Sequence, residues 1–173
     1  MVRRVLCAMA AILVLGMPFA RAEYFDNLVR LHVVADSDSE AEQAFKLRVR
    51  DGVLVYAQEL LKNCTSPDDA YLLICENTDG FQKAAQAVAD AEGNTAEIHV
   101  ETGVFAFPDR DYDGALVPAG DYRALRVVIG SGTGHNWWCV LYPTLCAPDP
   151  ETQDVVYYSV IVEWLMNVFG GGA

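Results

Sequence analysis

Apolar and polar positions divide the first third of the chain into a strand and a long helix. Residues 28–35 are mostly aliphatic, and Arg30 and His32 alternate with apolar neighbours, as in a half-buried strand. The short polar residues at 36–39 then end this strand and can cap a helix. Because apolar side chains next recur at helical spacing, we predict the longest helix of the chain from residue 41 to about residue 61.

Two further helices are predicted after the long one. Ser66 is a capping residue, Pro67 suits the first helical turn, and two acidic residues follow, so a short helix begins there and runs to Cys75. The next helix begins at Thr78, because apolar residues follow with the spacing of one helix face. Gly93 is placed to end it.

The second half of the chain changes from helical to extended periodicity. Strands are predicted at residues 95–102, 104–107 and 123–129. Farther along, residues 155–161 are β-branched and aromatic, and residues 162–169 can form a terminal helix packed on the sheet. This order of elements favours an α+β fold, a two-layer domain with helices packed on a largely antiparallel sheet.

Residues 1–22 have the layout of a cleavable secretion signal peptide. Arg3 and Arg4 supply the positive start, an uncharged apolar run follows, and a small-residue cleavage pattern ends at Ala22. A membrane-spanning helix needs about 20 apolar residues, and this run is shorter. We therefore expect cleavage, with retention as an anchor as the alternative, and a single globular domain at residues 23–173 that does not span the membrane.

The charge of the chain excludes one class of function. The sequence has 12 basic and 24 acidic residues, a net charge of −12, and loss of the three arginines of the signal would make it −15. Nucleic-acid binders present a basic patch to phosphates, and no run of Lys or Arg here is longer than a pair. We therefore expect no nucleic-acid partner.

Four cysteines remain in the exported chain, and an even number outside the cytoplasm suggests disulfides. Three pairings are possible. Cys139 and Cys146 bracket a short segment that Pro143 would help to turn back, so we favour a disulfide between them. Closing that loop should stabilise the fold by roughly 2.5 kcal/mol. Cys64 and Cys75 are then either a second pair or two buried thiols.

One acidic segment matches half of a calcium-binding loop. Asp109, Asp111, Asp113 and Gly114 have the spacing of its first half, but Gly120 stands where the bidentate glutamate belongs. An acidic surface turn is the simpler interpretation. We expect no metal ion.

The glycine-rich segment at residues 130–134 could cradle a phosphate with its amides. A P-loop, however, continues with Lys and Ser or Thr into a helix, and this segment continues with His and Asn. We expect no cofactor.

His135, Asn136 and Cys139 invite comparison with a Cys/His hydrolase. A catalytic thiol must be free, whereas Cys139 has a disulfide partner available, and no second acid or base is placed to orient the imidazole. We therefore predict no catalytic residues and no enzyme. His32 is interpreted as a satisfied or surface histidine, because no metal-spaced partner lies nearby.

Trp137 and Trp138 are adjacent tryptophans beside the glycine-rich segment. In an extended segment they face opposite ways, so one indole can enter the core while the other stays available; burial of both is the alternative. An exposed Trp next to a loop is a common partner anchor. We therefore predict a loop at residues 130–146 whose partner-binding residues are Gly134, His135, Asn136, Trp137 and Trp138.

Several segments resemble the stage II sporulation protein R family. They are LHVVADSDS at 31–39, KLRVRD at 46–51, PAGDYRALRVVIG at 118–130 and, most specifically, GHNWWCVLYPTLC at 134–146. The chain departs from the family pattern at a few positions, which are Asp36 in place of Asn, Thr133 in place of a charged residue, Tyr142 in place of Phe and Thr144 in place of Pro. None of these departures removes a Trp or Cys of the last segment.

The resemblance implies an intercellular signal of sporulation. Such a protein is made in the forespore, is exported into the space between forespore and mother-cell membranes, and activates a membrane-bound aspartic protease there. That protease processes the precursor of the mother-cell sigma factor, sigma E. The alternatives from the residues alone are an exported Cys/His hydrolase and a binding module for a cell-wall or calcium ligand.

Overall fold

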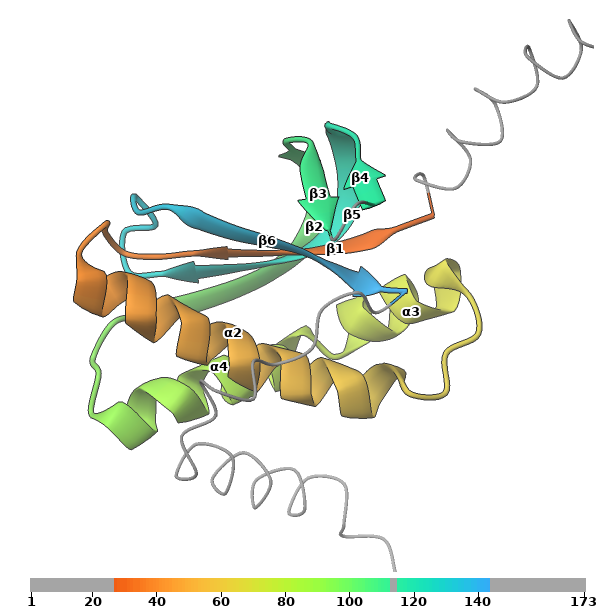
Figure 1. Ribbon diagram of the computed structural model, residues 1–173. Helices are drawn as coiled ribbons and strands as arrows, with labels where there is room; N and C mark the ends of the chain where they lie inside the picture. The colour runs from red at the N-terminus through yellow and green to blue at the C-terminus, as the bar shows by residue number, and fades with distance from the viewer. Residues whose placement is uncertain (1–26, 113–114, 144–173) are drawn as a thin grey trace, which may run out of the picture.

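The computed structural model describes residues 27–112 and 115–143. Its elements are, in chain order, β1 (Val29–Val34), α2 (Glu40–Leu61), α3 (Pro67–Glu76), α4 (Thr78–Glu92), β2 (Ile98–Phe107), β3 (Arg110–Tyr112), β4 (Ala115–Val117), β5 (Gly120–Ile129) and β6 (Asn136–Tyr142) (Figure 1). The signal peptide at 1–22 and the C-terminal elements predicted at 155–161 and 162–169 lie outside the described residues.

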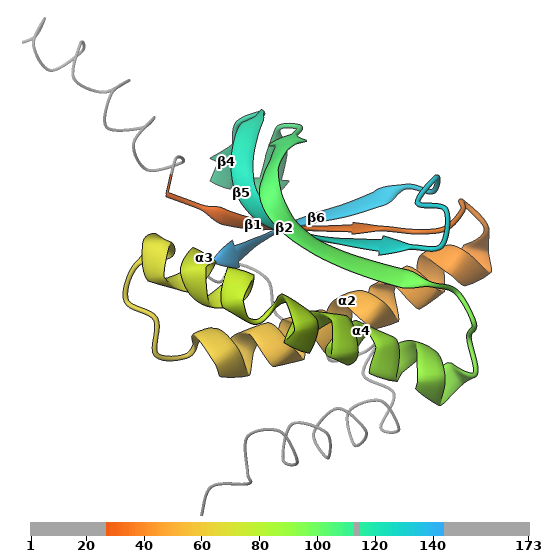
Figure 2. The same ribbon diagram turned by 180° about the vertical axis from the view of Figure 1, so that it is seen from behind.

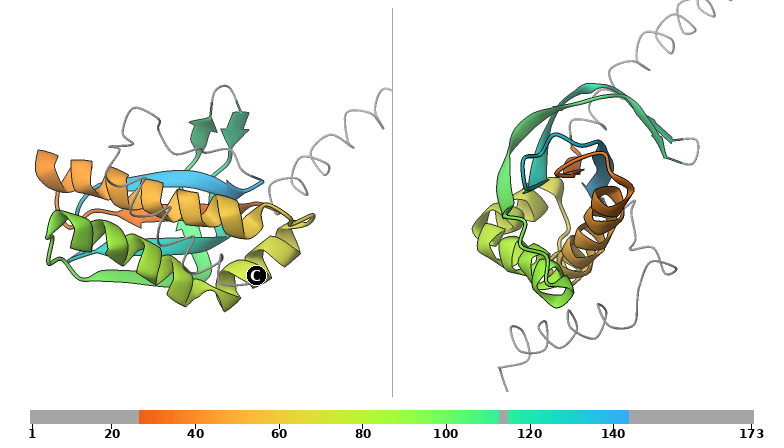
Figure 3. Two further views of the ribbon diagram at one scale, coloured as in Figure 1. Left: turned by 90° about the horizontal axis from the view of Figure 1, so that it is seen from below. Right: turned by 90° about the vertical axis from the view of Figure 1, so that its left-hand side faces the viewer.

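The long strands form one mixed sheet in the order β2-β5-β1-β6. β1 runs parallel to β5, whereas the β1–β6 and β2–β5 pairs are antiparallel. Helices α2, α3 and α4 lie on one face of this sheet, as the two views of Figure 3 show. The predicted α+β fold, a two-layer domain with helices on a largely antiparallel sheet, is confirmed.

The helix ends follow from local chemistry. The Ser39 hydroxyl accepts a hydrogen bond from the Glu42 amide at 3.3 Å at the start of α2, and the Ser66 hydroxyl accepts from the Asp69 amide at 3.1 Å at the start of α3. α4 ends at Gly93, whose φ of 64° favours a residue without Cβ. These boundaries were all predicted. Within the described ranges, no helix is long and apolar enough to cross a membrane.

The limits of the three strands predicted in the second half were wrong. The strands predicted at 95–102 and 104–107 are one strand, β2, which continues through Gly103. β5 begins at Gly120, three residues before the predicted start at Arg123. β2 and β5 pair over their whole lengths. This long-range pairing keeps residues such as Gly103 and Gly120 in the strands, although their own β propensity is low.

Half of the described part of the loop predicted at residues 130–146 is a strand. β6 occupies Asn136–Tyr142 and pairs with β1 at the edge of the sheet. The residues before Asn136 form the turn that leads into this strand, and residues 144–146 lie outside the described ranges. The short β3–β4 hairpin was not predicted at all.

Both faces of the sheet carry apolar clusters. The larger cluster lies on the helix side and includes Leu31, Phe45 and Leu125. A smaller cluster, with Phe107 and Tyr122, lies on the other side. Figure 2 shows the β3–β4 hairpin at the ends of β2 and β5, away from the helices. Side chains of β1 that face away from the helices are therefore buried rather than exposed.

Candidate functional site

The turn after β1 and the turn before β6 are held together by hydrogen bonds. We call residues 35–39 and 130–135 the loop pair. The Asp36 carboxylate accepts from the Ser131 amide at 2.5 Å, and the Asp36 carbonyl accepts from the hydroxyls of Ser131 and Thr133 at 2.9 and 2.8 Å. The Ser131 amide is the largest cause that lowers the pKa of Asp36. Two segments distant in sequence thus form one structural unit.

His135 is fixed within the loop pair by Asp38. The Asp38 carboxylate accepts from the His135 amide at 2.6 Å and lies 2.5 Å from its Nδ1. The Lys46 ammonium of α2 donates to the His135 carbonyl at 3.0 Å. The hydrogen bond from the His135 amide is the main reason that the pKa of Asp38 is lowered. The His135 side chain is nevertheless 81% exposed, so one edge of the imidazole can contact a partner.

The glycine-rich segment allows this close packing. Gly130 and Gly132 have φ angles of 56° and 63°, in the left-handed region that favours glycine. A Cβ on Gly130 would overlap the Asp36 carboxylate, and one on Gly134 would overlap the main chain of Ser37. The amides of this segment that were considered for phosphate binding already donate within the chain: the Ser131 amide donates to the Asp36 carboxylate, and the others donate to main-chain carbonyls.

We predict that Gly134→Ala lowers the free energy of unfolding by about 2 to 3 kcal/mol. The new Cβ would overlap the Ser37 carbonyl, and a main-chain group cannot move aside as a side chain can. Gly93→Ala is the control: its φ is +64° but nothing lies within 4 Å of the added Cβ. That change should cost only about 1 kcal/mol. Urea unfolding measures both, and equal losses would contradict tight packing at Gly134.

Trp137 and Trp138 face opposite sides of β6, and both are half-buried. Trp137 packs on the helix-side cluster, with the Arg50 guanidinium 4.8 Å from its ring centre. Trp138 stacks on His32 with ring centres 4.1 Å apart and meets Phe107 edge-on at 4.8 Å. The opposite orientations of the two indoles were predicted. The predicted difference in their exposure is small, because both side chains are half-buried.

Two basic residues of β1 are buried behind Trp138 and the hairpin. Arg30 is fully buried; its Nε donates to the Cys139 carbonyl at 2.8 Å and its Nη2 to the Tyr112 hydroxyl at 2.7 Å. His32 is 8% exposed, and neither ring nitrogen has a hydrogen-bond partner among the described residues. Burial lowers the pKa of both groups. His32 is therefore a buried histidine and not a surface one, and the Asn136 side chain opposes the effect of burial on its pKa.

A pocket of about 380 Å³ opens beside the loop pair. It is lined by Asp38, Pro108, Arg110, Thr133, Gly134, His135, Asn136 and Trp138. Four of the predicted partner-binding residues, Gly134, His135, Asn136 and Trp138, thus meet at one pocket. Trp137 lies on the opposite face of β6. Arg110 was not identified from the sequence, because it lies in the β3–β4 hairpin, which was not predicted, and this hairpin places it at the pocket.

His135 and Cys139 do not form the pair that a Cys/His hydrolase needs. His135 is exposed at the loop pair, whereas Cys139 is fully buried in the helix-side cluster. The imidazole is held by Asp38, so it is not directed at the thiol position. Cys146 lies outside the described residues, and the Cys139–Cys146 disulfide stays a prediction.

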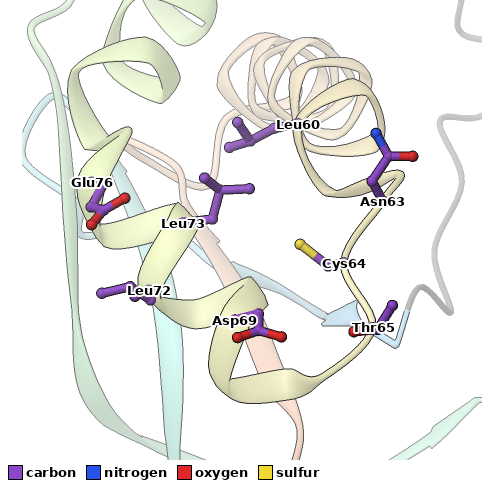
Figure 4. A pocket seen from close by; sticks show the side chains of 8 residues that line it. All are labelled: Leu60, Asn63, Cys64, Thr65, Asp69, Leu72, Leu73 and Glu76. Atoms are coloured by element: carbon purple, nitrogen blue, oxygen red, sulfur yellow. The ribbon is translucent and has the colours of Figure 1, made fainter.

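Cys64 and Cys75 are free thiols, so the second disulfide is not formed, and both are half-buried rather than buried. Cys64 lines a pocket of about 340 Å³ between the end of α2 and α3, and its sulfur points into it (Figure 4). Burial, with a smaller contribution from Asp69, raises the pKa of the Cys64 thiol. Such a thiol is a poor nucleophile at neutral pH.

The calcium-loop half-motif falls partly outside the structure. Asp113 and Gly114 are not among the described residues, and Asp111 lies on β3. In the described ranges, no group of three His, Cys, Asp or Glu side chains could hold a metal ion.

Comparisons with known proteins agree on one family. The family model described as stage II sporulation protein R matches residues 25–152. A curated protein of Bacillus subtilis (strain 168), named stage II sporulation protein R, is 35% identical over 131 residues, which are 76% of this chain. The chain spans 58% of the length of that relative. No solved structure matches the chain. The chain belongs to the stage II sporulation protein R family.

Proposed function

We propose that this protein is a secreted sporulation signal that acts between the two cells of a sporangium. The forespore exports it into the space between forespore and mother-cell membranes. There it activates a membrane-bound aspartic protease, which then processes the precursor of sigma E. Membership in a sporulation family supports the proposal.

The observation that carries the proposal is the rigid surface at the loop pair. Asp36 and Asp38 lock the turn before β6, so the residues around the pocket are held in one arrangement before any partner arrives. A preorganised surface loses little conformational freedom on binding. The exposed imidazole of His135 and the half-buried indole of Trp138 offer polar and apolar contacts side by side. A protein with this surface can act by binding alone.

The proposal predicts that His135→Ala keeps most of its signalling activity. The variant loses the exposed contact between the imidazole Nδ1 and the Asp38 carboxylate, which contributes little because solvent screens it, but keeps the His135 main-chain hydrogen bond. In a sporulating host that lacks its own copy, sigma E precursor processing should fall by no more than about fivefold at normal exported protein level. An enzyme that used His135 as its base would lose about a hundredfold or more.

A reconstitution separates a signal from a hydrolase. The purified exported protein is added to membranes that contain the aspartic protease and the precursor. Processing should require both proteins, and the exported protein alone should release nothing from cell-wall peptide or ester substrates. Turnover of such a substrate without the protease, together with its loss in His135→Ala, would show that the protein is an enzyme.

A further inference from the structure

The outer edge of β2 is an unpaired sheet edge. β2 is the terminal strand in the order β2-β5-β1-β6, and it pairs with β5 from Ile98 opposite Ile129 to Phe107 opposite Gly120 without a register shift. In Figure 2 it is the long curved strand nearest the viewer. Among the described residues, no strand pairs with its other side.

A glutamine side chain already occupies the first part of this edge. The Gln82 side chain of α4 donates to the Ile98 carbonyl at 2.6 Å and accepts from the Val100 amide at 2.9 Å. One amide side chain thus supplies the donor and acceptor that a neighbouring strand would supply. Since Glu97, one residue before β2, instead accepts from the Gly130 amide next to β5, even-numbered residues of β2 face outward.

The same alternation leaves the second part of the edge open. Thr102, Val104 and Ala106 direct their N–H and C=O groups away from β5. Within the described ranges, no hydrogen bond uses these outward groups. Val104 is also 64% exposed, which is unusual for a valine in a strand.

Protection against strand pairing is missing at this edge. Natural edge strands usually carry a Lys, a Pro, a bulge or an inward charge. β2 contains no Lys or Pro, and its register is unbroken. Its Glu101 is paired with Arg126 at 2.6 Å, and Arg123, opposite Val104, is paired with Asp68 at 2.7 Å. The edge therefore presents main-chain groups and apolar surface with its charges neutralised.

The charge of the whole chain decides between a second copy of the chain and a different protein as the occupant of this edge. A second copy would bring together two chains that each carry a net charge of −12, and such chains repel each other. A neutral or basic segment of a different protein meets no such repulsion. We propose that the edge from Thr102 to Ala106 is a strand-addition site for an extended, neutral or basic segment of another protein. This surface is at the opposite edge of the sheet from β6, and it does not depend on the proposed function.

Two substitutions at one position test the main-chain contact. Val104→Pro removes an outward N–H, and because β5 does not use that group, the sheet keeps its ladder. Val104→Thr keeps the N–H and a β-branched side chain. Hydrogen exchange of the purified protein should show fast exchange at Thr102, Val104 and Ala106, with protection of Gly103 and Phe105 unchanged in both variants.

The partner is captured in sporulating cells. A benzophenone amino acid replaces Ala106 in the full-length protein, in the wild-type background and in each Val104 variant. After irradiation, the peptide cross-linked to this position is sequenced. We expect one neutral or basic segment of another protein, an adduct reduced at least about tenfold by Val104→Pro, and an adduct within about twofold of wild type for Val104→Thr. Benzophenone at Leu72, an exposed apolar residue of α3, should not give this adduct.

Each other result overturns the proposal. An adduct between two copies of the chain would make this edge a self-association surface. An acidic partner segment would contradict the charge argument. An adduct that persists in Val104→Pro, or no adduct specific to Ala106, would show that strand pairing does not occur there. If Val104→Pro lowers the protection of Gly103, Thr102→Pro replaces it, because the Thr102 N–H also points outward.

Discussion

Arg30→Ala should destabilise the protein by about 3 to 5 kcal/mol, the largest stability loss that we expect from a single substitution here. The side chain is fully buried, and its guanidinium carbon lies 4.4 Å from the ring centre of Phe107 and 5.0 Å from that of Tyr122. Truncation leaves a cavity between these rings. It also leaves the Cys139 carbonyl and the Tyr112 hydroxyl without the donors that they accept from.

Arg30→Met separates lost packing from lost charge. Met fills much of the same volume but donates no hydrogen bond. The Nη1 atom of Arg30 is buried without a partner in the described part of the chain, and burial lowers the pKa of the guanidinium. Burial of this charge therefore costs free energy of folding. We expect Met to cost only about 1 to 2 kcal/mol. Urea unfolding followed by circular dichroism measures both, with the exposed Lys83→Ala as control. An Ala variant as stable as the control would disprove the packing role.

The parts of the fold that depend on local chemistry could be predicted. Ser39 and Ser66 accept hydrogen bonds from amides within three residues, and Gly93 ends α4 through its own φ. Their residue types alone carry that information. The helices and the strand β1 were therefore placed within about two residues, and the order of elements was enough for the fold class.

The parts that depend on distant segments could not be predicted. Asp36 and Ser131 are 95 residues apart, and nothing near either residue indicates their hydrogen bond. Arg30 and His32 alternate with apolar residues, a pattern typical of a solvent-facing side of a strand. Because the hairpin and Trp138 cover that side, both are buried. The glycines at 130, 132 and 134 were a usable signal for close approach, but the groups that approach them belong to the same chain: the Asp36 carboxylate at Gly130, the Val128 side chain at Gly132 and the Ser37 main chain at Gly134.

Trp138→Ala should reduce sigma E precursor processing about thirtyfold, which corresponds to roughly 2 kcal/mol of binding free energy. The reason is position: Trp138 lines the pocket with His135 and Asn136, on the side of β6 away from the helices. The substitution also removes the ring contacts with His32 and Phe107, so we expect a stability loss of about 2 to 3 kcal/mol. Processing is therefore compared at equal exported protein level, by immunoblot of protein and precursor in a sporulating host without its own copy.

Trp137→Ala is the matched comparison, because it removes the same side chain one residue earlier. Trp137 packs on the helix-side cluster and under Arg50, so its loss should lower the free energy of unfolding by about 3 kcal/mol. Its effect on processing should follow from lower protein level and disappear when the levels are matched. If the partner binds the pocket side of β6, precursor processing at equal protein level should differ between the two variants. If the partner needs only an intact fold, processing should be the same. If the two variants process the precursor equally at equal protein level, the pocket beside the loop pair is not the contact surface.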